Sequence, residues 1–341
     1  MTSDLVPRLL EDYGNRTRVA LCEYLRPRAP QRHLYNLVAD YPRRGGRMLR
    51  PSLCLATARA FGASADEALT SAVALELLHN AFLVHDDVED ESDERRGRPT
   101  LHAIHGVPVA INVGDALVVL GIRALTDNRR TLGTRLALCV LEEAAHMACE
   151  SVEGQALELG WRRDNALYLT DADYLEMVLK KTCWYTTIFP SRVGALIGTR
   201  EPQSLDRFVR FGFFLGAAFQ IQDDVLNLQG DEARYGKESS GDLWEGKRTL
   251  MLIALLRAAR DDERTRLSAF LSLPRPERRA ADVRWVRERM AAYGCVDYAR
   301  QVAHALAGAA RHECTALYAG LPRTRDREFI EALPGWVLAR N

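Results

Sequence analysis

The sequence predicts an all-α protein that folds as one large helical bundle around a central cavity. Apolar residues recur at three- and four-residue intervals along almost the whole chain, whereas alternating segments bounded by turn residues are very few. The 341 residues are 47% apolar and 27% charged, a globular composition that can bury a substantial core. The sequence contains no long linker and no fixed-period repeat, so we expect residues 1–341 to form a single domain.

The overall charge is balanced, with 46 Lys plus Arg against 46 Asp plus Glu, so no net field attracts the protein to nucleic acid or an anionic membrane. No run approaches 18 uninterrupted apolar residues, which argues against a membrane span. Seven Cys is an odd count without the spacing of paired metal ligands, and the first residues lack the apolar stretch of a signal peptide. We therefore expect a cytoplasmic protein with no nucleic-acid partner.

The predicted helices follow one another with short breaks at Gly, Pro and Asp residues, such as Gly62 and Pro202. The same apolar spacing supports each helix in turn: 4–25, 47–61, 65–90, 107–125, 132–159, 171–197, 203–228, 244–260, 283–293, 298–318 and 325–338. Two of them, at residues 73–84 and 208–222, are apolar nearly all round, a pattern typical of the centre of a bundle. Each of these two stretches runs directly into paired aspartates.

The first of these acidic pairs belongs to the run from Asp86 to Asp90. Asp86 and Asp90 are four residues apart, so they lie on one helix face, one turn apart. Two such carboxylates repel each other unless a cation lies between them, and Mg²⁺ binds hard oxygen ligands while keeping positions open for phosphate. An isolated pair would more simply be a solvated acidic helix end. The second pair, Asp223 and Asp224, at the end of the other core helix favours a metal site.

Several clusters of cations accompany the acidic pairs. Arg47 and Arg50 lie at the start of a predicted helix, where free backbone N–H groups and the helix dipole also favour an anion. Arg95 and Arg96 follow the first acidic run. The chain has only four lysines: Lys180, Lys181, Lys237 and Lys247. The last two flank the region of the second acidic pair. Together these residues predict local binding of a phosphate-rich ligand.

The order of these motifs resembles the trans-isoprenyl diphosphate synthases, or polyprenyl synthetases, over most of the chain. Arg47 replaces the family's usual Lys and keeps the charge, whereas Asn227 replaces the last aspartate of the second motif and loses one, so we leave Asn227 out of the metal site. The resemblance rests on the following segments: 45–51, His79, 86–90, 95–100, 114–117, Lys181-Thr182, Phe219-Gln220 with Asp223-Asp224, and 236–237 through 247–249.

The resemblance implies a role for each matching residue. Asp86 and Asp90 would hold two Mg²⁺ ions on an allylic diphosphate, Asp223 would hold a third, and Asp224 would support that site. The allylic diphosphate would also contact Arg95, Lys181, Lys247 and Lys237. Isopentenyl diphosphate would contact Arg50, His79 and Arg96, and Arg47 is counted among the substrate-binding residues. Gln220 and Thr182 would line the region where an allylic carbocation forms, and a homodimer is expected.

The implied activity is head-to-tail prenyl transfer, in which diphosphate leaves the allylic substrate and the double bond of isopentenyl diphosphate attacks the resulting cation. Two other interpretations share the fold. A class I terpene cyclase would need no second diphosphate site, which the segment 45–51 with His79 and Arg96 speaks against. A non-catalytic regulatory subunit could lose its carboxylates, yet both acidic pairs are intact.

The length of the product is predicted from the helix that precedes Asp86. Phe82 lies one turn before Asp86 on the same helix, about 6 Å away along the helix axis, and points towards the cavity that would take the growing tail. Ala81 beside it is small, so the tail could pass towards Leu78 and Leu75. We therefore expect geranylgeranyl diphosphate as the main product, with farnesyl diphosphate as the close alternative.

Overall fold

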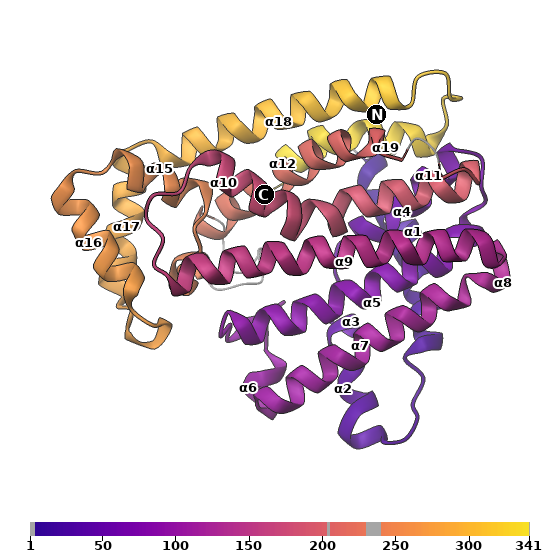
Figure 1. Ribbon diagram of the computed structural model, residues 1–341, viewed down its shortest axis with the longest axis horizontal. Helices are drawn as coiled ribbons and strands as arrows, with labels where there is room; N and C mark the ends of the chain where they lie inside the picture. Colours follow the sequence, from indigo (N-terminus) through magenta and orange to yellow (C-terminus); the bar gives the residue numbers. More distant parts are fainter. Residues whose placement is uncertain (1–3, 203–204, 230–239, 341) are drawn as a thin grey trace.

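The computed structural model describes residues 4–202, 205–229 and 240–340. Figure 1 shows long helices packed along one another, with α18 at the top, α9 across the middle, and α5 and α7 below it. The all-α prediction is confirmed. The α-helices are α1 (Leu5–Tyr24), α2 (Asn36–Val38), α3 (Asp40–Arg43), α4 (Leu49–Ala60), α5 (Ala65–Glu89), α6 (Leu101–His105), α7 (Val107–Asp127), α8 (Arg129–Leu132), α9 (Thr134–Arg163), α10 (Asp171–Val178), α11 (Phe189–Thr199), α12 (Arg207–Gln229), α14 (Gly241–Glu245), α15 (Leu250–Ala258), α16 (Asp261–Ser272), α17 (Ala280–Ala292), α18 (Cys295–Leu317) and α19 (Arg325–Leu338).

Helices α5 and α12 form the centre of the bundle, as their apolar sequences predicted. Helix α5 begins with a capping box, in which the Ser64 side chain accepts from the backbone of Glu67 and the Glu67 carboxylate accepts from the backbone of Ser64. Helices α4, α7 and α11 pack around α5, while α18 and α19 pack against α12. Both central helices are therefore held rigidly up to the acidic residues at their C-terminal ends.

The helix predicted over 171–197 is continuous but changes its winding. It consists of α10, a π-helical segment η2 (Leu179–Ile188) and α11. Thr170 and Asp173 form a capping box at its start. A π-helical turn holds more residues than an α-turn and is frequent at functional sites. Segment η2 packs against α9 and α12, and Lys181 and Thr182 within it line a cavity.

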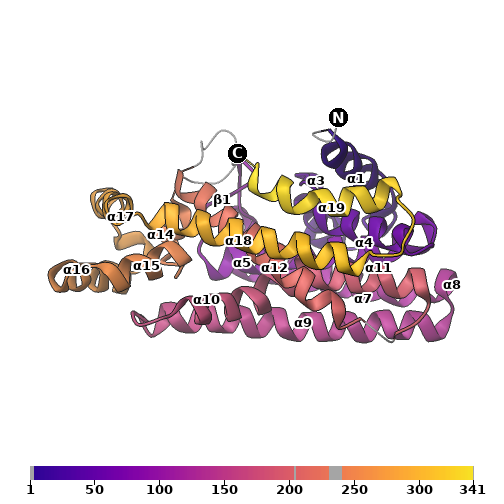
Figure 2. The same cartoon turned by 90° about the horizontal axis from the view of Figure 1, so that it is seen from above.

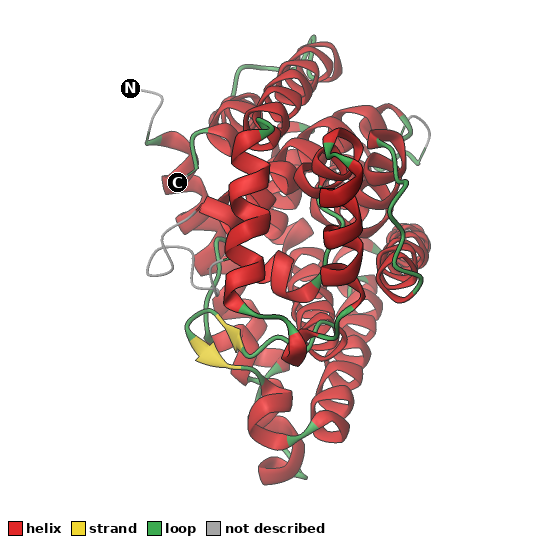
Figure 3. Cartoon of the chain, turned by 90° about the vertical axis from the view of Figure 1, so that its left-hand side faces the viewer, coloured by secondary structure: helices red, strands yellow, loops and turns green. Residues whose placement is uncertain are grey.

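A small hairpin departs from the purely helical prediction. Strands β1 (Glu94–Arg95) and β2 (Arg98–Pro99) pair antiparallel, with Arg95 opposite Arg98. Figure 3 shows this hairpin in yellow, on the left side of that view. Each strand is only two residues long, too short for an alternating pattern to reveal it.

Two helix predictions near the C-terminal third were wrong. The stretch 244–260 is not one helix, because Gly246 adopts a left-handed φ of 72° and separates α14 from α15. Helix α16 lies in a stretch where no helix was predicted. Its sequence is strongly charged and buries few residues, so the apolar spacing was too sparse to detect. Helices α16 and α17 project at one end of the bundle (Figures 1 and 2).

Two stretches of the described chain are long and apolar enough to cross a membrane by length and composition alone: Ala65–Glu89 and Val107–Leu132. Of the most apolar part, 72% is buried inside the molecule in the first stretch and 44% in the second. The first is therefore a core helix. The second exposes an apolar face along α7, formed by Val107, Ile111, Val119 and Ile122. Ile104 on the neighbouring α6 is also exposed.

Candidate active site

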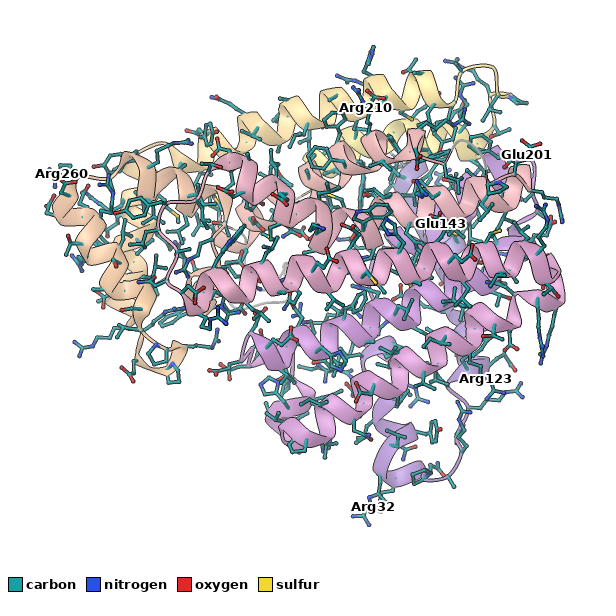
Figure 4. The ribbon with its side chains drawn as sticks, viewed as in Figure 1. Arg32, Arg123, Glu143, Glu201, Arg210 and Arg260 are labelled. Atoms are coloured by element: carbon teal, nitrogen blue, oxygen red, sulfur yellow. The ribbon has the colours of Figure 1, made fainter. Side chains whose placement is uncertain are left out.

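A cavity of about 730 Å³ lies where the C-terminal ends of α5 and α12 meet the start of α4, the hairpin, α9 and η2. Many arginines lie on the outer surface, where Arg32, Arg123 and Arg260 project from the molecule (Figure 4). The arginines around the cavity differ from these because all except Arg47 are buried or half-buried. The residues predicted from the sequence that line the cavity are Arg47, Arg50, His79, Phe82, Asp86, Arg95, Arg96, Lys181, Thr182, Gln220, Asp223, Asp224 and Lys247.

Of the predicted residues that the structure describes, Asp90 does not line the cavity. Lys237 lies outside the described residues. Asp90 has a fully buried side chain, whose oxygens lie 2.6 Å from Lys247 Nζ and 2.5 Å from Arg162 Nη1. Burial raises the pKa of Asp90 to about 7, although Lys247 acts in the opposite direction. Helix α9 extends one turn beyond its predicted end at 159, and this turn places Arg162 on Asp90.

Asp86 faces the cavity and is contacted by two cations. Its carboxylate oxygens lie 3.3 Å from Lys181 Nζ and 3.7 Å from Arg95 Nη2. Lys181 also donates to Glu158 at 2.7 Å. Burial opposes the charged form of Lys181, yet Glu158 and Asp86 together raise its pKa above the ordinary value. The first acidic cluster is therefore neutralised by cations of the chain itself.

Asp87, the residue after Asp86, points away from the cavity and anchors the fold. Its side chain is 1% exposed, accepts from Tyr41 Oη at 2.5 Å and from Arg95 Nε at 2.8 Å, and makes a second contact with Arg95 Nη2. Arg95 is thus held from behind while it lines the cavity. This buried pair fixes one of the cations that the sequence assigned to the allylic diphosphate.

The second acidic pair divides into an outer and an inner carboxylate. Asp223 accepts from Arg340 Nη2 at 2.5 Å, and the Arg340 guanidinium lies 3.9 Å from the centre of the Phe219 ring. Asp224 is buried and accepts from Tyr174 Oη and Gln220 Nε2, both at 2.7 Å. Burial raises the pKa of Asp224 well above its ordinary value.

The Gln220 side chain continues this network towards η2. Its Oε1 atom accepts from Thr182 Oγ1 at 3.0 Å, so the two residues predicted to line the reaction region contact each other. Asn227, one turn beyond Asp223, is used differently. Its Oδ1 atom accepts from the Asp242 backbone N–H at 3.0 Å and positions the start of α14.

A second group of cations lies across the cavity, near the start of α4. Arg50 Nη1 lies 3.3 Å from His79 Nε2, and Arg50 Nη2 donates to Thr186 Oγ1 at 3.0 Å. The guanidinium carbon of Arg50 lies 4.4 Å from the centre of the Tyr185 ring. Burial, and then the charges of Arg50 and Arg96, hold the pKa of His79 well below 6.5, so its imidazole is neutral at pH 7.

The apolar part of the cavity begins at Phe82. Its ring packs edge-on against Tyr185, with the ring centres 5.6 Å apart. Leu83, Met177 and Val178 continue the lining. Ala81 is completely buried and does not line the cavity, so it does not provide the space beside Phe82 that the sequence suggested.

Sequence reasoning missed several residues of the cavity. Gln155 and Glu158 project from α9 into the cavity. The available signal was this pair of polar residues on the inward-facing side of a long helix. Gly154 beside them lets α9 approach η2, because a Cβ there would lie 2.2 Å from the Lys181 backbone nitrogen. Arg44 and Arg340 carried no sequence signal, since one is among several arginines and the other lies far from every motif.

The acidic residues fit divalent cations in a particular way. Among residues 4–202, 205–229 and 240–340, no group of three or more His, Cys, Asp or Glu side chains is close enough to hold a metal ion together. Asp86 and Asp223 nevertheless present carboxylate oxygens to the same cavity from two helices. This donor set suits Mg²⁺, which binds through one or two carboxylates and takes its other ligands from substrate phosphates and water.

Comparisons with known proteins agree with this geometry. A family model described as polyprenyl synthetase matches residues 31–290. A short chain isoprenyl diphosphate synthase from Methanothermobacter thermautotrophicus is 36% identical over 259 residues, which cover 76% of this chain and 77% of that protein. Two crystal structures have similar folds. The geranylgeranyl pyrophosphate synthetase from Pyrococcus horikoshii Ot3 has a TM-score of 0.85 and 30% identity over 99% of each chain. The polyprenyl synthase from Caulobacter crescentus CB15, complexed with calcium and isoprenyl diphosphate, has a TM-score of 0.86 and 29% identity over 99% of this chain and 97% of that one.

Proposed function

Because the chain belongs to the polyprenyl synthetase family, we propose that it condenses isopentenyl diphosphate with an allylic diphosphate and releases mainly geranylgeranyl diphosphate. The family match confirms the resemblance that the motifs predicted, and the enzyme is a trans-prenyltransferase. The proposal takes residues 1–341 as one all-helical domain. Farnesyl diphosphate is the alternative product, to be separated from the first by product analysis.

The observation that carries the proposal is the presence of two separate groups of cations on one cavity. Lys181, Lys247 and Arg95 lie with the acidic clusters, whereas Arg50 and Arg96 lie with His79 near the start of α4. A terpene cyclase, which ionises a single diphosphate, would leave the second group without a ligand. A non-catalytic subunit would not need carboxylates of both acidic pairs on the cavity, as Asp86 and Asp223 are here.

In the proposed site, Asp86 and Asp90 would hold two Mg²⁺ ions and Asp223 would hold a third, with Asp224 supporting it from behind. When bound, these ions supply positive charge that stabilises the departing diphosphate. Asp90 reaches this role only by exchanging its contacts with Lys247 and Arg162. The lysine and arginine thereby become available to the diphosphate, with Lys237 as a further proposed contact.

The chain's own residues provide the rest of the chemistry. Lys181, Lys247 and Arg95 bind the allylic diphosphate and draw negative charge away from its carbon. Gln220 and Thr182 lie beside the reacting carbon, with their dipoles fixed by the hydrogen bond between them. Arg47, Arg50, His79 and Arg96 orient isopentenyl diphosphate so that its double bond faces that carbon. The apolar lining excludes water, and the released diphosphate accepts the final proton.

The proposed product length follows from Phe82 and the residues below it. The ring lies one turn from Asp86 and narrows the apolar part of the cavity together with Tyr185. A tail of 20 carbons must pass this constriction, so Phe82 is the proposed control on chain length. Several relatives are geranylgeranyl diphosphate synthases, which supports the longer of the two products.

We also propose a homodimer, located in the cytoplasm, that pairs through the apolar face of α7. The side chains of Val119 and Ile122 are 63% and 48% exposed, and they lie on the same helix face as Ile111 and Val107. Figure 2 shows α7 and α9 running together along one long side of the molecule. A Val119→Glu variant should be monomeric by light scattering, while the wild-type protein should have twice that mass.

Incubation with Mg²⁺, isopentenyl diphosphate and dimethylallyl, geranyl or farnesyl diphosphate tests the proposed activity. We expect elongated diphosphates that end mainly at 20 carbons after dephosphorylation and chromatography. A hydrocarbon product would indicate a cyclase. No consumption of isopentenyl diphosphate, with all three allylic substrates, would contradict prenyl transfer.

A further inference from the structure

One of the two cavity arginines of the hairpin, Arg96, lies in an unusual turn. Arg96 and Gly97 connect β1 to β2, and their φ values are 55° and 69°. A two-residue turn with both φ values positive is a type I′ hairpin turn, and a non-glycine residue at its first position is uncommon. Arg96 therefore needs contacts from the rest of the protein to keep this conformation.

Arg44, which precedes the glycine pair of the segment 45–51, supplies contacts along both strands of the hairpin. Its Nη1 atom donates to the carbonyl oxygens of Arg95 at 3.0 Å and Arg98 at 3.3 Å, and its Nη2 atom donates to that of Pro99 at 2.8 Å. Its Nε atom donates to Asp40 at 2.6 Å. The Arg44 side chain is only 2% exposed, although its partners Arg98 and Pro99 lie at the surface.

The two pocket arginines depend on Arg44 to different degrees. The Arg95 guanidinium has its own buried anchor in Asp87. Arg96 has hydrogen bonds to the carbonyl oxygens of Gly45 and Tyr41, both of which lie in the segment that Arg44 joins to the hairpin. If Arg44 released the hairpin, Arg95 would stay fixed through Asp87, whereas Arg96 would lose the alignment of its turn with its carbonyl partners.

We propose that Arg44 is a positioning residue for isopentenyl diphosphate, acting by holding the Arg96-Gly97 turn against the start of α4. The inference rests on the proposed function, in which Arg96 binds that substrate. Because every donor atom of the Arg44 guanidinium contacts the protein, Arg44 organises the site without taking a phosphate itself. The planar fork is essential, since a lysine has one nitrogen and cannot reach three carbonyl oxygens and Asp40 together.

The test compares steady-state kinetics of Arg44→Gln, Arg44→Lys and Arg96→Gln with the wild-type enzyme. Arg43→Gln is the matched control, because Arg43 is the neighbouring arginine, is exposed and does not line the cavity. We expect both Arg44 variants to raise the KM for isopentenyl diphosphate about tenfold. The KM for the allylic diphosphate and kcat at saturation should change less than about threefold, and Arg43→Gln should match the wild type.

Three outcomes would overturn the proposal. A wild-type KM in Arg44→Lys would mean that charge alone matters. Equal increases in both KM values would mean general disturbance of the cavity. A lower melting temperature with unchanged KM values would mean a purely structural role. If Arg44→Gln does not fold, Arg44→Lys decides the question, because it keeps the charge and a contact to Asp40.

Arg96→Gln separates this inference from the proposed function. A raised KM for isopentenyl diphosphate in Arg96→Gln with normal values in the Arg44 variants would refute the role of Arg44 alone. A normal KM in Arg96→Gln would refute the assigned substrate site, and the role of Arg44 with it.

Discussion

Arg340 Nη2 lies 2.5 Å from Asp223 Oδ1, so the penultimate residue of the chain neutralises a carboxylate that we assign to metal binding. Asp86 and Asp90 are neutralised in the same way, by Lys181 and Lys247. Each acidic ligand is therefore paired with a cation. Metal ions and diphosphate would exchange these pairs together, because the ion takes the carboxylate and the phosphate takes the lysine or arginine.

Removal of the cavity carboxylates should abolish catalysis while leaving the fold intact. Asp86→Ala and Asp223→Ala should each lower kcat at least about a hundredfold in saturating Mg²⁺. Their side chains are 21% and 30% exposed, so the melting temperature should stay within about 3 °C of the wild type. Asp66→Ala, at the exposed start of the same helix, is the control and should be fully active. Near-normal rates in either cavity variant would refute the metal assignment.

The neighbouring Asp87 should behave in the opposite way. Asp87→Ala leaves Arg95 buried without its main partner and removes the acceptor of the Tyr41 hydroxyl. The free energy of unfolding should fall by about 3 kcal/mol or more, measured by urea denaturation. Asp86→Ala serves as the comparison, one residue away and partly exposed. If the two variants are equally stable, Asp87 is not the anchor described above.

Enlarging the apolar cavity at Phe82 should lengthen the products. Phe82→Ala removes the ring that packs on Tyr185 one turn from Asp86, which opens space along α5. Chromatography of the dephosphorylated products should show a shift of at least one five-carbon unit. Phe214→Ala is the control, since this partly buried phenylalanine on α12 does not line the cavity. An unchanged distribution in an active Phe82→Ala enzyme would place the stop on another helix.

Stability should decrease in mild acid through His79. Its folded-state pKa is held well below 6.5, so below about pH 6.5 the unfolded chain binds a proton that the folded protein refuses. This lowers the free energy of unfolding by up to about 1.4 kcal/mol per pH unit as the pH falls. In His79→Gln the difference between pH 7.5 and pH 5.5 should shrink. His312→Gln, at an exposed position, should keep the wild-type difference. Parallel profiles for all three proteins would exclude this role for His79.

Much of the fold was predictable because helices in a bundle leave a regular apolar pattern. The apolar spacing placed α5 and α12 at the centre of the bundle. Because each of these apolar stretches runs directly into a pair of aspartates, the position of the aspartates at the helix ends was predictable as well. The same reasoning failed for α16, where charged residues outnumber buried ones, and at Gly246, where one left-handed residue separates two helices. Neither feature changes the local apolar content enough to be detected.

The site was predictable where chemistry concentrates in short motifs. The acidic pairs and the segment 45–51 identified most of the cavity. The partners of those residues were not predictable, because Arg162 on Asp90 and Arg340 on Asp223 join positions 72 and 117 residues apart. Such contacts depend on how the helices pack, and one sequence taken alone does not show which distant positions are in contact.

The close approach at Gly154 has a consequence for mutational tolerance. The backbone of η2 occupies the place where a side chain at residue 154 would begin, so even alanine would push Lys181 out of line with Asp86. A saturation mutagenesis map scored by activity should therefore show position 154 as intolerant, although glycine brings no reactive group. In such a map, Gly154 would look like a catalytic residue. The cause of its intolerance would instead be the close approach of the α9 and η2 backbones.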